Sequence, residues 1–209
     1  MEEKDIQNEL ASIRNLMERS SKFISLSGLS GILAGIYALI GAGVAYFIIR
    51  EHPTTASNNS FFENLGNAIY IFYSFCLIGG LVLIASVVTG LILSKRKARK
   101  KGQLIWGKTS RELLFHMAIP LITGGLAIIV FLYYGDIKYI IPAMLIFYGL
   151  ALVSAGNFTF TDIRYLGILE VILGITSAFL PGYGLLFWAI GFGALHIIYG
   201  SMMYLKYDR

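Results

Sequence analysis

The sequence predicts an all-α, polytopic membrane protein built as a six-transmembrane-helix bundle. The chain is 56% hydrophobic and only 14% charged, with a mean hydropathy of +0.71, whereas a soluble domain carries about 25% charged residues. Its apolar residues form six long runs, and nearly all of its basic residues fall on one side of those runs. Because the runs are continuous rather than alternating, they indicate helices and not the strands of a membrane barrel.

Each run approaches the length that a membrane helix requires. About 20 apolar residues cross a hydrocarbon core of about 30 Å, and these runs extend from 16 to 26 residues. The predicted spans are Ile24–Ile49, Ile69–Leu93, Leu113–Tyr134, Ile140–Gly156, Tyr165–Leu180 and Leu185–Leu205.

The fifth span is the shortest, and it contains Glu170. At ~1.5 Å per residue it covers only about 24 Å. Thr161 or Asp162 could cap this helix and lengthen it through Arg164, whose side chain can reach the interface. The alternative is a re-entrant segment, which would move the C-terminus to the other side of the membrane.

Basic residues orient the predicted bundle. With six spans, 15 of the 17 lysines and arginines share one side, and only Arg50 and Lys138 lie on the other. The positive-inside rule then predicts a multi-pass membrane protein with both termini in the cytoplasm. The basic run at 95–101 is expected to touch anionic lipid headgroups. Because that run lacks interleaved aromatic residues and a supporting fold, no nucleic-acid partner is expected.

Two regions differ in character. Residues 1–22 predict a cytoplasmic amphipathic helix, whose apolar stripe would pack on a second copy or on the cytoplasmic loops, or would stay solvated. Residues 23–209 form the transmembrane domain. In its first span, Gly31 and Gly35 belong to a ridge of small side chains that permits close helix approach. The ridge would serve either packing inside the bundle or a homo-oligomer.

A weak internal repeat suggests that the bundle consists of three related helical hairpins. The segment Tyr148–Gly156 aligns with Phe192–Gly200 at an offset of 44 residues, and both glycines match. Parallel repeats of this kind occur in transporters. Apolar segments also align by chance, so unrelated hairpins are the alternative.

The candidate polar site consists of three ionisable residues inside predicted spans: His116, Glu170 and His196. Such groups are costly to bury in a membrane and are usually paired or functional. Glu170 lies 13 residues before the turn at Tyr183 and His196 lies 13 after it, so an antiparallel hairpin would bring them to the same depth. His116 follows Arg111 closely, and all three are expected in the cytoplasmic half.

Two interpretations of this site remain open. Glu170 and His196 could form a structural hydrogen bond, or Glu170 could instead bond a hydroxyl on a neighbouring helix. Alternatively, Glu170 could bind protons or cations. Because His116 and His196 do not have the number or spacing of metal or haem ligands, no metal and no cofactor is expected. The chain carries no nucleophile motif, so no catalytic residue and no enzymatic activity are expected.

The stretch Met17-Glu18-Arg19-Ser20-Ser21-Lys22-Phe23-Ile24-Ser25-Leu26-Ser27-Gly28-Leu29-Ser30-Gly31-Ile32 resembles the start of a group of small polytopic bacterial inner-membrane proteins. That group has no established function, and the resemblance implies no catalytic or ligand residue. Two functions are therefore considered. One is a non-enzymatic accessory or sensory protein that acts through partners on its cytoplasmic face. The alternative is a small transporter or channel with a polar site around Glu170.

Overall fold

The fold is an all-α bundle, which confirms the predicted class. The computed structural model describes residues 27–52, 61–100 and 106–208. The amphipathic helix expected at 1–22 lies outside these residues. Within them, the long helices are α2 (Gly28–Glu51), α3 (Phe61–Lys100), α4 (Lys108–Tyr134), α5 (Ile140–Ala155), α6 (Thr161–Phe179) and a C-terminal helix.

The C-terminal helix is composite. It runs without a break through α7 (Gly184–Trp188), a π-helical segment (Ala189–Leu195), α8 (His196–Met203) and a final π-helical turn (Tyr204–Asp208). Short 3₁₀ turns precede α5 (Ile137–Tyr139) and α7 (Pro181–Tyr183). We refer to residues 184–208 together as the C-terminal helix.

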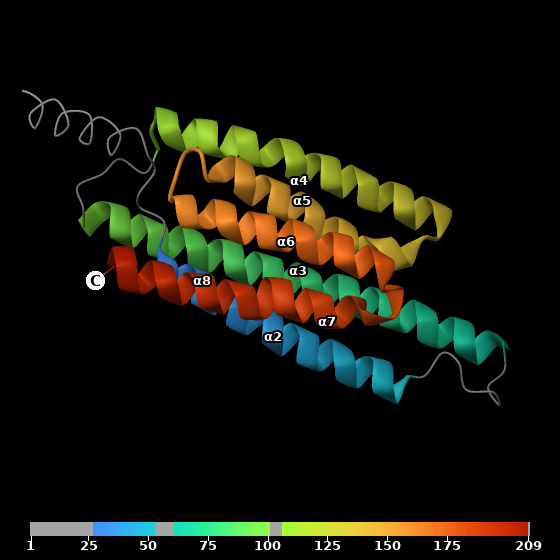
Figure 1. The fold of residues 1–209 in the computed structure, drawn as a ribbon. Coiled ribbons are helices and arrows are strands. Elements are labelled where there is room, and N and C mark those ends of the chain that lie inside the picture. The colour runs from blue at the N-terminus through green and yellow to red at the C-terminus, as the bar shows by residue number, and fades with distance from the viewer. Residues whose placement is uncertain (1–26, 53–60, 101–105, 209) are drawn as a thin grey trace, which may run out of the picture.

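The long helices lie side by side in two groups (Figure 1). The helices α4, α5 and α6 form one group, and α2, α3 and the C-terminal helix form the other. The closest packing joins α5 to α6 and α2 to the C-terminal helix, whereas α6 and the C-terminal helix touch much less. The third expected hairpin is therefore not a tightly packed pair, because each of its helices packs mainly on a partner from another hairpin.

Glycines explain why α5 and α6 approach so closely. A Cβ atom added at Gly149 would lie 2.6 Å from the carbonyl oxygen of Gly167, and one added at Gly167 would lie 2.6 Å from the carbonyl oxygen of Gly149. The two backbones therefore touch where they cross. In lipid, such contact replaces the hydrophobic effect as the source of helix association.

A second glycine contact joins α2 to the C-terminal helix. A Cβ atom at Gly35 would lie 2.6 Å from the Gly193 carbonyl oxygen, and one at Gly31 would lie 3.1 Å from the Gly200 Cα. The small-residue ridge of α2 is thus occupied within the chain. A homo-oligomer formed through Gly31 and Gly35 would have to displace the C-terminal helix from this ridge.

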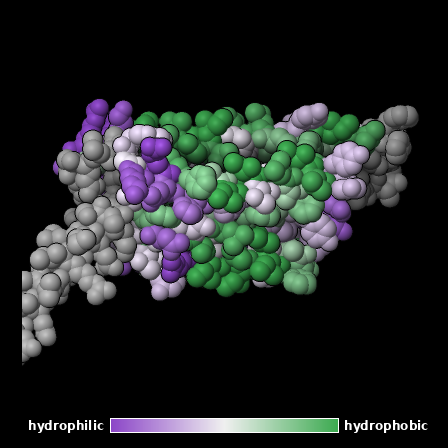
Figure 2. Space-filling model, turned by 90° about the horizontal axis from the view of Figure 1, so that it is seen from above, coloured by the Kyte–Doolittle hydropathy of each residue, from purple (hydrophilic) through white to green (hydrophobic). Residues whose placement is uncertain are grey.

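The surface has the character of a membrane protein. In the part of the chain that the structure describes, five helical segments are long and apolar enough to cross a bilayer: Gly28–Glu51, Leu65–Lys100, Lys108–Tyr134, Ile137–Ala155 and Pro181–Asp208. Large apolar side chains on α3 and α4 point outward, including Leu77 (64% exposed) and Ile122 (63%). Figure 2 shows hydrophobic side chains across the middle of the visible face, with most of the strongly hydrophilic ones toward one end and a few near the other.

The helix α6 is not among these five segments, and it carries three charged residues, Asp162, Arg164 and Glu170. It is nevertheless one unbroken helix alongside α5 (Figure 1) and not a re-entrant segment. Its N-cap is Phe160, so the expected capping by Thr161 or Asp162 is wrong. Its 19 residues give a length of about 28 Å, close to the hydrocarbon core.

The helix α3 is longer than the predicted span Ile69–Leu93. It has 40 residues, which corresponds to about 60 Å, roughly twice the thickness of the hydrocarbon core. Its first turns precede the predicted span, and its last turns include the basic residues at 95–100. The ends of α3 therefore extend beyond an apolar layer of ordinary thickness.

Candidate functional site

The carboxyl group of Glu170 lies at the middle of α6 with its side chain 0% exposed. Gly191 of the π-helical segment makes room for it, because a Cβ atom there would lie 2.6 Å from Glu170 Oε2. Neither carboxyl oxygen of Glu170 accepts a hydrogen bond, and the buried hydroxyl of Ser177 on the same helix also has no hydrogen-bond partner. Unpartnered polar atoms at such depth are rare and call for an explanation.

The imidazole of His196 lies beside this carboxyl group. Its Nδ1 is 2.9 Å from the carbonyl oxygen of Gly191 and 3.5 Å from Glu170 Oε1. Its Nε2 is 2.8 Å from the hydroxyl oxygen of Tyr148 on α5. Because a carbonyl can only accept, Nδ1 must carry the proton, and in the neutral ring Nε2 accepts from the Tyr148 hydroxyl.

The π-helical segment Ala189–Leu195 explains this geometry. It widens the helix and directs the carbonyl of Gly191 at the ring of a residue five positions later. An aromatic layer covers the cluster, with Phe192 between Trp188 (ring centroids 5.7 Å apart) and Tyr148 (5.2 Å). Segments of π-helix inside α-helices are rare and occur frequently at functional sites.

We call Tyr148, Glu170, Gly191 and His196 the polar cluster. It draws on α5, α6 and the C-terminal helix, so it joins the two helix groups of Figure 1. Glu170 and His196 each lie at the centre of their helices. Their place in the cytoplasmic half of the membrane stays a prediction, because position along a helix does not give depth in a bilayer.

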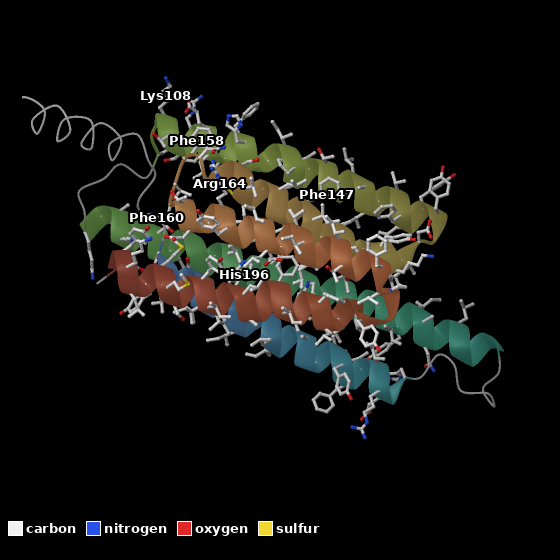
Figure 3. All side chains as sticks on the ribbon, viewed as in Figure 1. Lys108, Phe147, Phe158, Phe160, Arg164 and His196 are labelled. Atoms are coloured by element: carbon white, nitrogen blue, oxygen red, sulfur yellow. The ribbon has the colours of Figure 1, made fainter. Side chains whose placement is uncertain are left out.

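The structure does not bring His116 to the polar cluster. This histidine is exposed on α4, and its ring stacks on Phe158 at 4.8 Å in the turn between α5 and α6. Figure 3 shows Phe158 near one end of the bundle and His196 about midway along it. Over the described ranges no group of three or more histidine, cysteine, aspartate or glutamate side chains could hold a metal ion.

Sequence reasoning missed Tyr148, Gly191 and Ser177. A search for ionisable residues inside spans does not select a tyrosine, a glycine or a serine. The only available signal was the repeat alignment, which pairs Tyr148 with Phe192, two residues whose rings are in contact. That alignment gave no reason to expect a hydrogen bond from Tyr148 to His196.

Charged and aromatic side chains form a second cluster at the end of the bundle where α3 ends and α2 and α6 begin. We call it the end layer; it consists of Lys97, Phe160, Asp162, Lys206, Tyr207 and Asp208. Asp208 forms an ion pair with Lys97, and its Oδ2 accepts hydrogen bonds from the Ser27 hydroxyl (3.0 Å) and the Gly28 amide (2.9 Å).

The end layer also holds the start of α6. Asp162 accepts hydrogen bonds from the Tyr207 hydroxyl at 2.7 Å and from the Lys206 ammonium at 3.1 Å. Partial burial opposes ionisation of Asp162, but these bonds outweigh it and hold the pKa of its carboxyl below its ordinary value. The ring of Tyr207 stacks on Phe160 at 4.0 Å. The C-terminal turn thereby contacts α2, α3 and α6 together.

Comparison with known proteins gives no assignment: family models, curated proteins and solved structures were each searched, and none matches this chain.

Proposed function

We propose that this chain is a non-enzymatic membrane protein of the bacterial plasma membrane, with an accessory or sensory role exerted through partners on its cytoplasmic face. The observation that carries this proposal is the sealed polar cluster. The Glu170 side chain is 0% exposed, and its Oε2 lies against Gly191, beside which Leu145 and Leu173 also pack. A carrier or channel needs a solvent path to its site, and this packing provides none in the described conformation.

The charge distribution supports the cytoplasmic face as the working surface. The basic residues at 95–100 lie at the same end of the bundle as Lys108, Arg164 and the end layer (Figure 3). Under the positive-inside rule this end faces the cytoplasm. It also carries the groups best suited to bind anionic lipid headgroups or an acidic partner surface.

Topology gives a first test of this proposal. Reporter fusions placed after residue 209 and within residues 53–60 should give opposite signals, because the two ends of the bundle would face opposite compartments. A reporter that is active only outside the cytoplasm should respond at 53–60 and stay silent after 209. Equal signals from both fusions would contradict the six-span arrangement.

Transport is the second candidate, and one observation favours it. Glu170 carries a carboxyl group with no hydrogen bond at mid-depth in the bundle, which is where transporters place coupling residues. In this view the described conformation is the occluded state of an alternating-access cycle.

Ion flux through reconstituted vesicles separates the two functions. The proposal predicts that vesicles containing the full chain leak protons, sodium and potassium no faster than empty vesicles, and that Glu170→Gln changes nothing. The control is Glu112→Gln, which makes the same chemical change at an exposed carboxyl on α4. A flux that disappears in Glu170→Gln and survives in Glu112→Gln would overturn the sensory role and establish transport.

A further inference from the structure

The most informative group in the polar cluster is the Nδ1–H of His196, because two acceptors compete for it. The carbonyl oxygen of Gly191 lies 2.9 Å from Nδ1 and accepts its hydrogen bond in the described structure. The carboxyl of Glu170 lies 3.5 Å from the same nitrogen, which is too far for a good hydrogen bond. A small movement would exchange one acceptor for the other.

The preferred acceptor depends on the state of Glu170. A protonated carboxyl needs no donor, so Nδ1–H can remain on the backbone carbonyl. A carboxylate buried without a donor would be very costly, and the Nδ1–H of His196 is the nearest donor that the described contacts offer to it. Loss of the proton should therefore draw Nδ1–H from Gly191 to Glu170.

We propose that the polar cluster binds a single exchangeable proton at Glu170, and that the Nδ1–H of His196 switches from the Gly191 carbonyl to the Glu170 carboxylate when this proton leaves. This inference rests on the proposed sensory function, which it deepens by naming the proton as the stimulus. When the proton binds, it adds to a carboxylate oxygen of Glu170, and Nδ1–H returns to Gly191. No other bond is made or broken.

The surroundings leave few other groups to titrate. Within the described part of the chain, the titratable side chains that face Glu170 are His196 from the C-terminal helix and Tyr148 from α5. The apolar side chains of Leu145 on α5 and Leu173 on α6 lie beside Gly191 next to the carboxyl. Among the described residues, the hydroxyl of Ser177, two turns along the same helix, is another buried polar group without a hydrogen-bond partner.

The change of acceptor should also alter the backbone of the π-helical segment. When the imidazole releases the Gly191 carbonyl, the π-helical segment loses one of the bonds that stabilise it, and the ring moves against Phe192. Phe192 in turn packs on Trp188, which is 8% exposed. The indole of Trp188 therefore lies close enough to report the change.

Trp188 fluorescence in nanodiscs provides the test. The chain has two tryptophans, so Trp106→Phe, at a side chain 69% exposed, leaves Trp188 as the only one. In this background we expect a reversible one-proton fluorescence transition as the pH is varied. Glu170→Gln should abolish it, Glu112→Gln should leave it unchanged, and Tyr148→Phe should keep it with a shifted midpoint, because Nε2 loses its donor.

Infrared spectroscopy of the same samples reads the carboxyl directly. The C=O band of a buried protonated carboxyl should disappear as the pH rises and should be absent in Glu170→Gln. A Trp188 transition or a carboxyl band that is the same in Glu170→Gln and the parent would overturn the proposal, as would the absence of both signals in the parent. If Glu170→Gln does not fold, His196→Gln should remove the fluorescence transition while keeping the band.

The two proposals fail separately. A missing Glu170 transition without ion flux would overturn the proton site and leave the sensory role standing. A Glu170 transition accompanied by Glu170-dependent flux would support the proton site and overturn the sensory role.

Discussion

Replacement of Gly149 by alanine should destabilise the bundle by about 1–3 kcal/mol, the usual cost of overpacking a filled interior. The added methyl group would lie 2.6 Å from the Gly167 carbonyl oxygen and 2.8 Å from the Val171 amide nitrogen. These are backbone atoms of the facing helix, so no side chain can move aside to relieve the contact. α5 and α6 would have to separate at the level of the polar cluster.

The free energy of unfolding in mixed micelles, titrated with a denaturing detergent, measures this effect. The matched control is Gly90→Ala in α3, where a Cβ atom would meet nothing within 4 Å. Alanine there should be neutral or stabilising by up to about 1 kcal/mol, because alanine favours a helix more than glycine does. Equal effects at the two positions would contradict the close packing of α5 on α6.

Replacement of Asp208 by alanine should lower the free energy of unfolding by about 1.5–3 kcal/mol, the range for hydrogen bonds to a charged group. The side chain of Asp208 is only 9% exposed, and it caps the first turn of α2 from the far end of the chain. A carboxylate is favoured there because the N-terminus of a helix carries partial positive charge. Its removal deprives the Gly28 amide of its acceptor and Lys97 of this carboxylate.

Two further variants define the source of the effect. Asp208→Asn keeps an acceptor for Ser27 and Gly28 but removes the charge, so its loss of stability should be intermediate. Asp136→Ala removes a carboxyl whose side chain makes no capping hydrogen bond, and it should change little. If Asp208→Ala were no more destabilising than Asp136→Ala, the end layer would not hold the C-terminal turn in place.

Hydropathy predicted the fold class well because it reports a physical constraint that acts along the chain. The run Ile140–Gly156 closely matches α5, since its boundaries are set by a turn at one end and by polar residues at the other. The predicted span Ile69–Leu93 was too short, because α3 continues through polar and basic residues that helices tolerate outside lipid. Hydropathy therefore predicts which part of a helix lies in the membrane, but it does not predict the residue at which the helix ends.

Distance from a turn placed Glu170 at the same level as His196, because residues equally far from a hairpin turn lie at the same level along its two helices. The same reasoning could not decide lateral position, and His116 lies on the outer face of α4. The sequence also contained no signal for the π-helical segment, since one wider turn leaves the pattern of apolar residues unchanged. It nonetheless determines which carbonyl the imidazole of His196 meets.

The central claim is that His196 links α5 to the C-terminal helix as a neutral ring with its proton on Nδ1. Solid-state ¹⁵N NMR tests this most directly. The chain has three histidines, so a variant carrying His52→Gln and His116→Gln isolates the signals of His196. The structure predicts a protonated Nδ1 and an unprotonated, hydrogen-bonded Nε2 whose resonance shifts in Tyr148→Phe. A proton on Nε2 alone, or an Nε2 resonance unaffected by Tyr148→Phe, would contradict the polar cluster described here.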